Sequence, residues 1–449
     1  MKDLIAIGAL FVWSCQTTPQ TPKLSKPDTI HAAIQPPQPN PYWSDLARLL
    51  GGIRPNDTLY WGSILRDSTW RSYAAEVERL WTFRKKALYD SLQVWAAQEL
   101  SPYHDWKGRV FYPFSGADWP TVFYIYPKGS SYIFFGLEQE GDPHYLRMLS
   151  PTDIVQNLRG PFLTLQDLLR LSFFKTKDMQ VQLAHGKVRG LLPVFLALFA
   201  RTGHKIYTVE HIYLKEGGII DTLPSSKPKP AQSAWDNPIT GLRFQIGLPE
   251  GPLQEVIYLS LNAANTGIER QVGSRDFLSR LRPCVSLIKS ASYLLFGRDF
   301  SEIRRLILTQ SVAILEEDSG IPFRFFDSTA WKTQLYGVYH QPIPLFRSKF
   351  QPDLWKAYRT YPVKRLPFTI GYHIMPGQSN LIWAVRRDPQ AVLPPLPEEA
   401  TQTSAERITP LPPQRLMYID TSLPLSKDTS STPTPQQLDS TEVPSGDSE

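Results

Sequence analysis

The chain has 449 residues, of which 42% are hydrophobic and 12% aromatic, and its formal net charge is +6. The aromatic content excludes a wholly disordered protein, and two cysteines are too few for a disulfide framework or a cysteine-rich structural zinc site. The 41 prolines against 26 glycines fit a folded body with proline-rich extensions.

The first fifteen residues have the pattern of a cleaved export signal. Lys2 precedes an apolar run from Leu4 to Trp13, which is too short for the roughly 17–25 residues of a membrane-spanning helix. The end of the run, Val12–Cys15, resembles a bacterial lipoprotein signal, in which the chain is cut before the cysteine and the thiol is lipidated. The resemblance implies removal of residues 1–14 and a lipid anchor on Cys15. An ordinary secretory signal cut elsewhere is the alternative.

Residues 15–41 form the predicted linker. Seven prolines lie between residues 16 and 41, with almost no large apolar side chain, so this segment is expected to extend rather than fold. Gln16 stands where an aspartate would resemble an inner-membrane retention signal. We therefore expect a lipid-anchored protein of the cell envelope, with the outer membrane favoured over the inner membrane.

Residues 42–389 are predicted to form a single α+β domain. Apolar residues at steps of three, four and seven predict a long helix over 68–100. Two β-branched and aromatic runs around a glycine-containing turn, 121–126 and 131–137, predict a hairpin. The remaining predicted elements are helices at 164–174, 193–201, 275–281, 284–296 and 300–316, and strands at 205–214, 241–248, 255–262, 322–327, 331–339, 368–374 and 380–387. These blocks do not alternate regularly, which favours α+β with mixed or antiparallel sheets over a doubly wound parallel sheet.

Aromatic and polar side chains are concentrated in the stretch before and after residue 110. The candidates for a sugar- or peptide-binding rim are His104, Trp106, Tyr112, Asp118 and Trp119, because ring faces cover C–H surfaces while polar groups select hydroxyls. Ordinary packing of loops against the core explains the same composition.

Lys289 is the first of the catalytic candidates. It belongs to a Ser-x-x-Lys match beginning at Ser286, the spacing of penicillin-binding enzymes. The same spacing recurs from Ser226 to Lys229 in an evident loop, so the match is attributed to chance. Lys289 lies in an apolar stretch and is expected to be a buried lysine, either in a structural ion pair or with a lowered pKa.

Asp318 is the second candidate, at the end of three consecutive acids. Carboxylates at the end of a predicted helix oppose its dipole, so they need compensation. Asp318 is expected either to close a turn with Gly320 or to act in general acid/base chemistry with His340 or His373. The sequence contains no phosphate-binding loop, dinucleotide fingerprint, nucleophile elbow or zinc motif. We therefore expect no cofactor and no metal.

The charge is unevenly distributed. Residues 390–449 are rich in Pro, Ser and Thr, hold nine acids against three bases, and are predicted to be disordered. The segment 15–389 correspondingly carries +12. Besides the membrane, an anionic envelope glycan or another envelope protein is an expected partner. Nucleic acid is not expected, because no Lys/Arg block is longer than three residues.

The body of the chain, over most of residues 110–375, also resembles a family of uncharacterised bacterial envelope proteins. The segments that carry this resemblance are Pro113–Asp118, Gly136–Glu138, Ser172–Thr176, Gly190–Pro193, Lys289–Leu294 and Asp318–Pro322. It implies one continuous unit and no known activity. A non-catalytic binding or assembly component is the predicted function. An envelope hydrolase that uses Asp318, with His373 or His340 in support, is the alternative.

Overall fold

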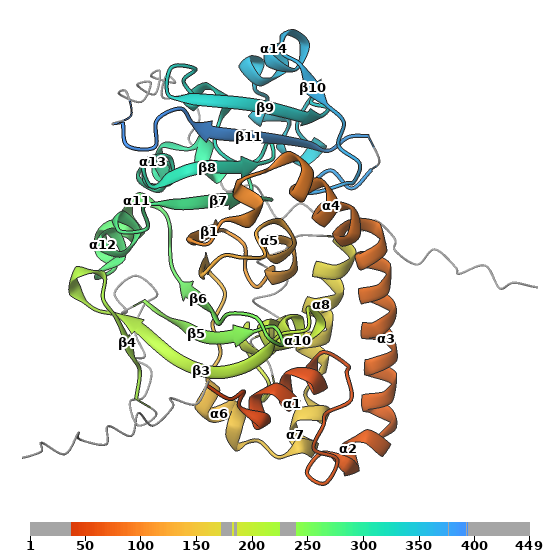
Figure 1. Cartoon of the computed structure of the whole chain (residues 1–449). Helices are drawn as coiled ribbons and strands as arrows, with labels where there is room; N and C mark the ends of the chain where they lie inside the picture. The colour runs from red at the N-terminus through yellow and green to blue at the C-terminus, as the bar shows by residue number, and fades with distance from the viewer. Residues whose placement is uncertain are drawn as a thin grey trace, which may run out of the picture. The chain divides into compact units, whose positions relative to one another are not determined.

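The computed structural model describes residues 37–171, 182–183, 186–224, 239–375, 377–391 and 393 (Figure 1). The described residues belong to one compact unit. The export signal, the linker up to residue 36, the tail from residue 394 and the segment Ser172–Thr176 lie outside them. Within the described part, no helix is both long and apolar enough to cross a membrane.

The α-helices and β-strands follow one another as blocks along the chain. The helices are α1 (Pro41–Leu50), α2 (Gly62–Arg66), α3 (Ser68–Arg84), α4 (Asp90–Glu99), α5 (Trp119–Ile125), α6 (Pro143–Met148), α7 (Pro151–Gln156), α8 (Arg159–Leu171), α10 (Leu192–Arg201), α11 (Asn265–Arg270), α12 (Ser274–Ser279), α13 (Ser301–Gln310) and α14 (Pro352–Thr360). The strands are β1 (Arg109–Pro113), β2 (Ser131–Gly136), β3 (Lys205–Leu214), β4 (Ile220–Thr222), β5 (Thr240–Gly247), β6 (Gln254–Ser260), β7 (Cys284–Ile288), β8 (Ser311–Glu316), β9 (Trp331–Gly337), β10 (Val363–Lys364) and β11 (Asn380–Arg386).

All these described strands belong to one mixed sheet, in the order β10-β9-β11-β8-β7-β1-β2-β6-β5-β3-β4. Its five central strands, β8, β7, β1, β2 and β6, are parallel. Antiparallel strands extend it on both sides, with β11 paired to β8 and β5 paired to β6. The predicted α+β class, with a mixed sheet in one domain, is confirmed.

Side chains alternate between the two faces of the sheet and fill two large hydrophobic cores, and a third, small cluster of described residues includes Leu335, Leu354 and Ile382. On β1, Val110 and Tyr112 join the larger core, whereas Phe111 joins the other. The larger core is covered by helices from the first half of the chain, including α1, α3, α5, α8 and α10, and the smaller one by α11, α12 and α13 (Figure 1). This two-sided burial explains why the central strands are apolar almost throughout.

Most predicted elements are present, and the long helix is confirmed: α3 continues through a π-helical turn at Lys85–Tyr89 into α4. The hairpin is wrong, because residues 119–125 form α5 and connect the parallel strands β1 and β2. The predicted helix 284–296 is also wrong, since its first five residues form β7. The predicted helix 300–316 ends at residue 310, and its last residues form β8.

Two further predicted strands are absent among the described residues. Residues 323–325 form a single 3-10 turn, and residues 368–374 have no strand structure. Glu316 is therefore the last residue of a buried strand, and Glu317 and Asp318 follow that strand rather than a helix. The helix dipole expected to oppose these acids is absent, because no helix ends there.

Candidate ligand-binding site

The connections of β1 and β7, neighbours at the middle of the sheet, leave toward opposite faces. β1 leads through α5, which packs in the larger core, to β2; β7 leads through α13, which packs in the smaller core, to β8. If the parallel strands are numbered as they occur in the chain, their order across the sheet from β6 to β8 is 3-2-1-4-5. Doubly wound nucleotide-binding sheets have this order, and their ligands bind beyond the carboxyl ends of the strands where the connections diverge.

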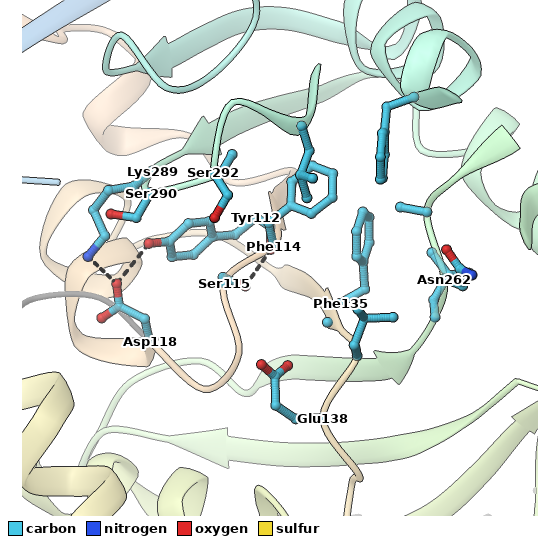
Figure 2. A pocket seen from close by; sticks show the side chains of 17 residues that line it. Tyr112, Phe114, Ser115, Asp118, Phe135, Glu138, Asn262, Lys289, Ser290 and Ser292 are labelled. Atoms are coloured by element: carbon cyan, nitrogen blue, oxygen red, sulfur yellow. Dashed lines mark hydrogen bonds and ion pairs between the residues drawn. The ribbon is translucent and has the colours of Figure 1, made fainter. Parts of the chain in front are cut away.

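A cavity of about 180 Å³ occupies this position. Its walls come from the segments that follow four parallel strands: 114–118 after β1, 137–138 after β2, 261–263 after β6 and 289–292 after β7. Figure 2 shows Tyr112, Asp118 and Lys289 meeting on one side of the cavity and Asn262 on the opposite side. The exposed residues Leu137 and Ser292 bring its lining to the protein surface.

A buried ion pair joins the segments that follow β1 and β7 on one side of the cavity. Lys289 Nζ lies 2.6 Å from Asp118 Oδ2, and both side chains are only 2% exposed. Asp118 also accepts hydrogen bonds from the Tyr112 hydroxyl at 2.7 Å and the Thr121 hydroxyl at 2.8 Å. Burial lowers the pKa of Lys289 despite the neighbouring Asp118, and burial raises the pKa of Tyr112 well above its usual value. Within the ion pair, the positive charge of Lys289 and the negative charge of Asp118 offset each other.

The backbone around the cavity is strained. Of the five non-glycine residues with positive φ in the described chain, Phe114, Ser290 and Ser292 line the cavity, and Tyr293 follows directly. Their φ angles lie between 53° and 57°. A left-handed conformation costs a non-glycine residue on the order of 1–3 kcal/mol and is concentrated at functional sites.

Glu138 supplies a carboxylate from the segment directly after β2. Its side chain is 3% exposed and lines the cavity (Figure 2). A Cβ atom at Gly136 would lie 2.2 Å from Glu138 Oε2, so this carboxylate folds back over the end of its own strand. Asn262, after β6, lines the opposite side, and its Oδ1 accepts a hydrogen bond from the Ala264 amide at 3.0 Å.

Asp318 is the centre of a separate buried network beyond β8. Its Oδ1 accepts hydrogen bonds from His373 Nε2 at 3.0 Å and Asn380 Nδ2 at 2.8 Å, and its Oδ2 accepts one from the Tyr293 hydroxyl at 2.5 Å. Burial opposes protonation of His373, but the hydrogen bond and charge of Asp318 outweigh it and raise the pKa of His373. The structure thus brings Asp318 and His373 together, but neither lines the cavity.

Glu317 connects this network to the cavity wall. Its Oε1 accepts a hydrogen bond from the Ser290 amide at 2.8 Å and another from the Ser319 hydroxyl. Its Oε2 is buried and has no hydrogen-bond partner among the described residues. Burial, reinforced by the charge of Asp318, raises the pKa of Glu317 to about 8.

The other sequence-predicted candidates are separated by the structure. Tyr112 and Asp118 line the cavity, as does Lys289. Trp119 is fully buried and donates a hydrogen bond to the Thr202 hydroxyl, while His104 and Trp106 bond to main-chain carbonyls of Ile125 and Arg109. His340 is exposed and has no bond to Asp318 in the described part of the chain.

Sequence reasoning missed Glu138, Asn262 and the connection from Glu317 to the cavity. The sequence signal for Glu138 is an acid directly after an apolar strand. This signal indicates a ligand site only when the preceding residues are recognised as the strand β1 and the helix α5. Within the described residues, no three or more His, Cys, Asp or Glu side chains are grouped to hold a metal ion.

The chain matched no protein-family model, no curated protein and no solved structure. Its function is therefore inferred from the position, the charge and the shape of the cavity. All residues that line this cavity belong to the described part of the chain.

Proposed function

We propose that this protein binds a phosphate-free nucleoside in the cavity between β1 and β7. The observation that carries the proposal is the position of Glu138, a buried carboxylate after the second parallel strand, beside the point where the connections diverge. In nucleotide-binding sheets of this order, an acid at that position accepts hydrogen bonds from ribose hydroxyls. Glu138 is the corresponding residue here.

The size and the aromatic lining of the cavity suit a base or a ribose. A cavity of about 180 Å³ is slightly larger than one of about 150 Å³ that holds a benzene ring. Phe114 packs against Phe135 with ring centroids 5.1 Å apart, and both line the cavity. Aromatic faces of this kind stack on bases, and the amide of Asn262 offers the donor and acceptor needed to recognise a base edge.

The charge of the lining disfavours phosphate. Asp118 and Glu138 are its acids, and its one lysine, Lys289, is bound to Asp118. The loop after β1 has a single glycine, Gly116, instead of a glycine-rich phosphate cradle. Asp118 directly precedes α5, where a phosphate would meet its negative charge. A neutral or positively charged nucleoside fits this lining better than a nucleotide.

The proposed binding activity agrees with the predicted lipid-anchored envelope protein. A tethered protein that binds nucleosides without chemistry would capture them at the cell surface, which is a non-catalytic binding role. The hydrolase alternative receives no support from the cavity, because Asp318 and His373 do not line it. Anchoring through Cys15 remains a prediction.

Calorimetric titration of the full chain with adenosine tests the proposal. We expect binding to the wild type and a loss of about ten- to hundredfold in Glu138→Gln, since a hydrogen bond to a charged group contributes about 1.5–3 kcal/mol. 2′,3′-Dideoxyadenosine lacks the ribose diol and should bind the wild type as weakly as adenosine binds Glu138→Gln. ATP should bind more weakly than adenosine.

Glu255→Gln is the matched control. Glu255 is a carboxylate on β6 that bonds to Ser131 and does not line the cavity, so this variant should bind adenosine like the wild type. Absence of adenosine binding at millimolar concentration, or equal affinity in Glu138→Gln and wild type, would contradict the proposal.

A further inference from the structure

The segment Lys289–Tyr293 forms one wall of the cavity and is held from behind by residues that lie outside the cavity. The amide of Ser290 donates to Glu317 Oε1 at 2.8 Å, and the amide of Ala291 donates to the Ser319 hydroxyl at 3.0 Å. The Tyr372 hydroxyl donates to the Ser290 carbonyl at 2.8 Å. These bonds satisfy the backbone of a segment that would otherwise relax from its left-handed conformation.

We propose that Glu317 is a positioning residue that closes this wall, and that the wall opens as pH rises because closure requires a proton on Glu317. Glu317 touches the wall through Ser290, is fully buried, and has one carboxyl oxygen with no hydrogen-bond partner among the described residues. If Glu317 were ionised, that oxygen would carry negative charge without a hydrogen bond from the described residues and without contact with solvent. Opening the wall would hydrate Glu317, since Ser292, two residues beyond the Ser290 amide that Glu317 accepts from, is already exposed.

The surroundings of Glu317 make ionisation costly. The titratable and charged groups facing it come from every element packed around it: Tyr112 on β1, Lys289 and Tyr293 after β7, Glu316 and Asp318 at the end of β8, and Tyr372 and His373 before β11. Asp318, the residue directly after Glu317, repels a charge on Glu317. His373 is bonded to Asp318 and offsets part of that repulsion.

The direction of the pH effect follows from linkage. In the closed state burial raises the pKa of Glu317 to about 8, whereas in a hydrated open state it returns toward the ordinary value of about 4.3. The closed state therefore binds the proton more tightly, and its advantage is complete below about pH 4 and lost progressively up to about pH 8.

Amide hydrogen exchange of the peptide covering residues 289–293 tests the proposal in the ligand-free full chain. After correction for intrinsic exchange, protection in the wild type should fall by up to tenfold per pH unit between pH 5 and pH 8. Glu317→Gln keeps the acceptor oxygen without the titration. It should match the wild type at pH 5 and retain more protection at pH 8.

Two other variants make the test independent of that one substitution. Tyr372→Phe removes the bond to the Ser290 carbonyl but no titrating carboxyl, so it should lower protection at every pH and keep the wild-type slope. Glu302→Gln, on α13 and paired with Arg305, is the control and should change nothing in this peptide. Equal slopes in Glu317→Gln and wild type would overturn the proposal, as would a wild-type protection that rises with pH.

The consequence for ligand rests on the proposed function. Adenosine affinity of the wild type should decline from pH 5 to pH 8, and that of Glu317→Gln should decline less. If exchange follows the expected pattern but adenosine does not bind, the positioning role stands and the nucleoside assignment fails. If adenosine binds and the exchange slope is unchanged in Glu317→Gln, only the positioning role fails.

Discussion

Among individual residues, Lys289 and Asp118 depend on each other most. Their side chains are equally buried and lie 2.6 Å apart. Removing two charges from water is costly, and their attraction repays that cost only while both are present. Loss of one partner leaves a charge in a low-dielectric site, whereas loss of both leaves mainly an imperfectly filled space.

This asymmetry gives a stability prediction. Asp118→Ala should lower the free energy of unfolding by about 3–5 kcal/mol, because it removes the carboxylate that forms the buried ion pair with Lys289. Adding Lys289→Met should restore part of that loss despite being a second change. Urea unfolding followed by tryptophan fluorescence measures both variants. A double variant less stable than Asp118→Ala alone would show that the pair stabilises the protein by more than mutual neutralisation.

The candidate site was predictable from sequence only residue by residue. Lys289 is a candidate because it lies in an apolar stretch, and Asp118 because it lies among aromatic residues. Their contact cannot be predicted from sequence, because 170 residues separate them. The sequence predicts Asp318 with either His340 or His373, and the structure brings Asp318 to His373, at 3.0 Å. Their separation from the cavity depends on the packing of the wall 289–293, which no local pattern encodes.

Among the secondary-structure elements, α5 and β7 show why the sheet was not recognised from the sequence. Residues 121–126 are β-branched and aromatic, which predicts a strand. Pro120 in the first turn of α5 and burial against the larger core nevertheless make residues 121–125 helical. Conversely, Cys284–Ile288 is buried on both faces, so it shows no period-two alternation and resembles a buried helix. If β1, α5 and β7 are not recognised in the sequence, the parallel arrangement of the central strands cannot be predicted.

The segment after β2 is held in place by close backbone packing. Leu191 and Leu192 donate their amides to the carbonyls of Gln139 and Glu140, both at 2.9 Å. At Gly190, where φ is +70°, a Cβ atom would lie 2.3 Å from the Gly141 nitrogen. Both a left-handed backbone and the absence of a side chain are needed here, just beyond Glu138.

Gly190→Ala is therefore expected to destabilise the fold by more than the conformational penalty alone. Gly377 also has a positive φ, +75°, but no atom lies within 4 Å of its Cβ position, so Gly377→Ala isolates the penalty of about 1–2 kcal/mol. Thermal unfolding should place Gly190→Ala below Gly377→Ala. Equal melting temperatures would mean that the contact with Gly141 relaxes freely.

For the whole molecule, the location of the protein is a separate question from its fold. No helix in the described body is long and apolar enough to span a membrane. The sequence predicts a lipid anchor at Cys15. The proline-rich segment 16–41 would then separate the body from the bilayer.

Replacing Cys15 by serine tests this anchor. Cys15→Ser should move the protein from the membrane fraction to the soluble fraction, because two or more acyl chains are what make such an anchor stable. Fractionation with immunoblotting measures the change, and adenosine binding by the variant should equal that of the wild type. If Cys15→Ser stays in the membrane fraction, the lipoprotein interpretation is wrong.

The order of strands in the sheet also decides when the molecule can fold. Arg109 on β1 pairs with Cys284 on β7, and β7 in turn pairs with β8, which ends at Glu316. A nascent chain released before residue 316 would leave an apolar central strand with an open edge, the kind of edge that recruits other chains. Pairing between such distant segments also makes folding slow. The cavity between these strands can therefore be completed only after its last lining residue, Phe300, has been made. Products that end before residue 316 are expected to aggregate.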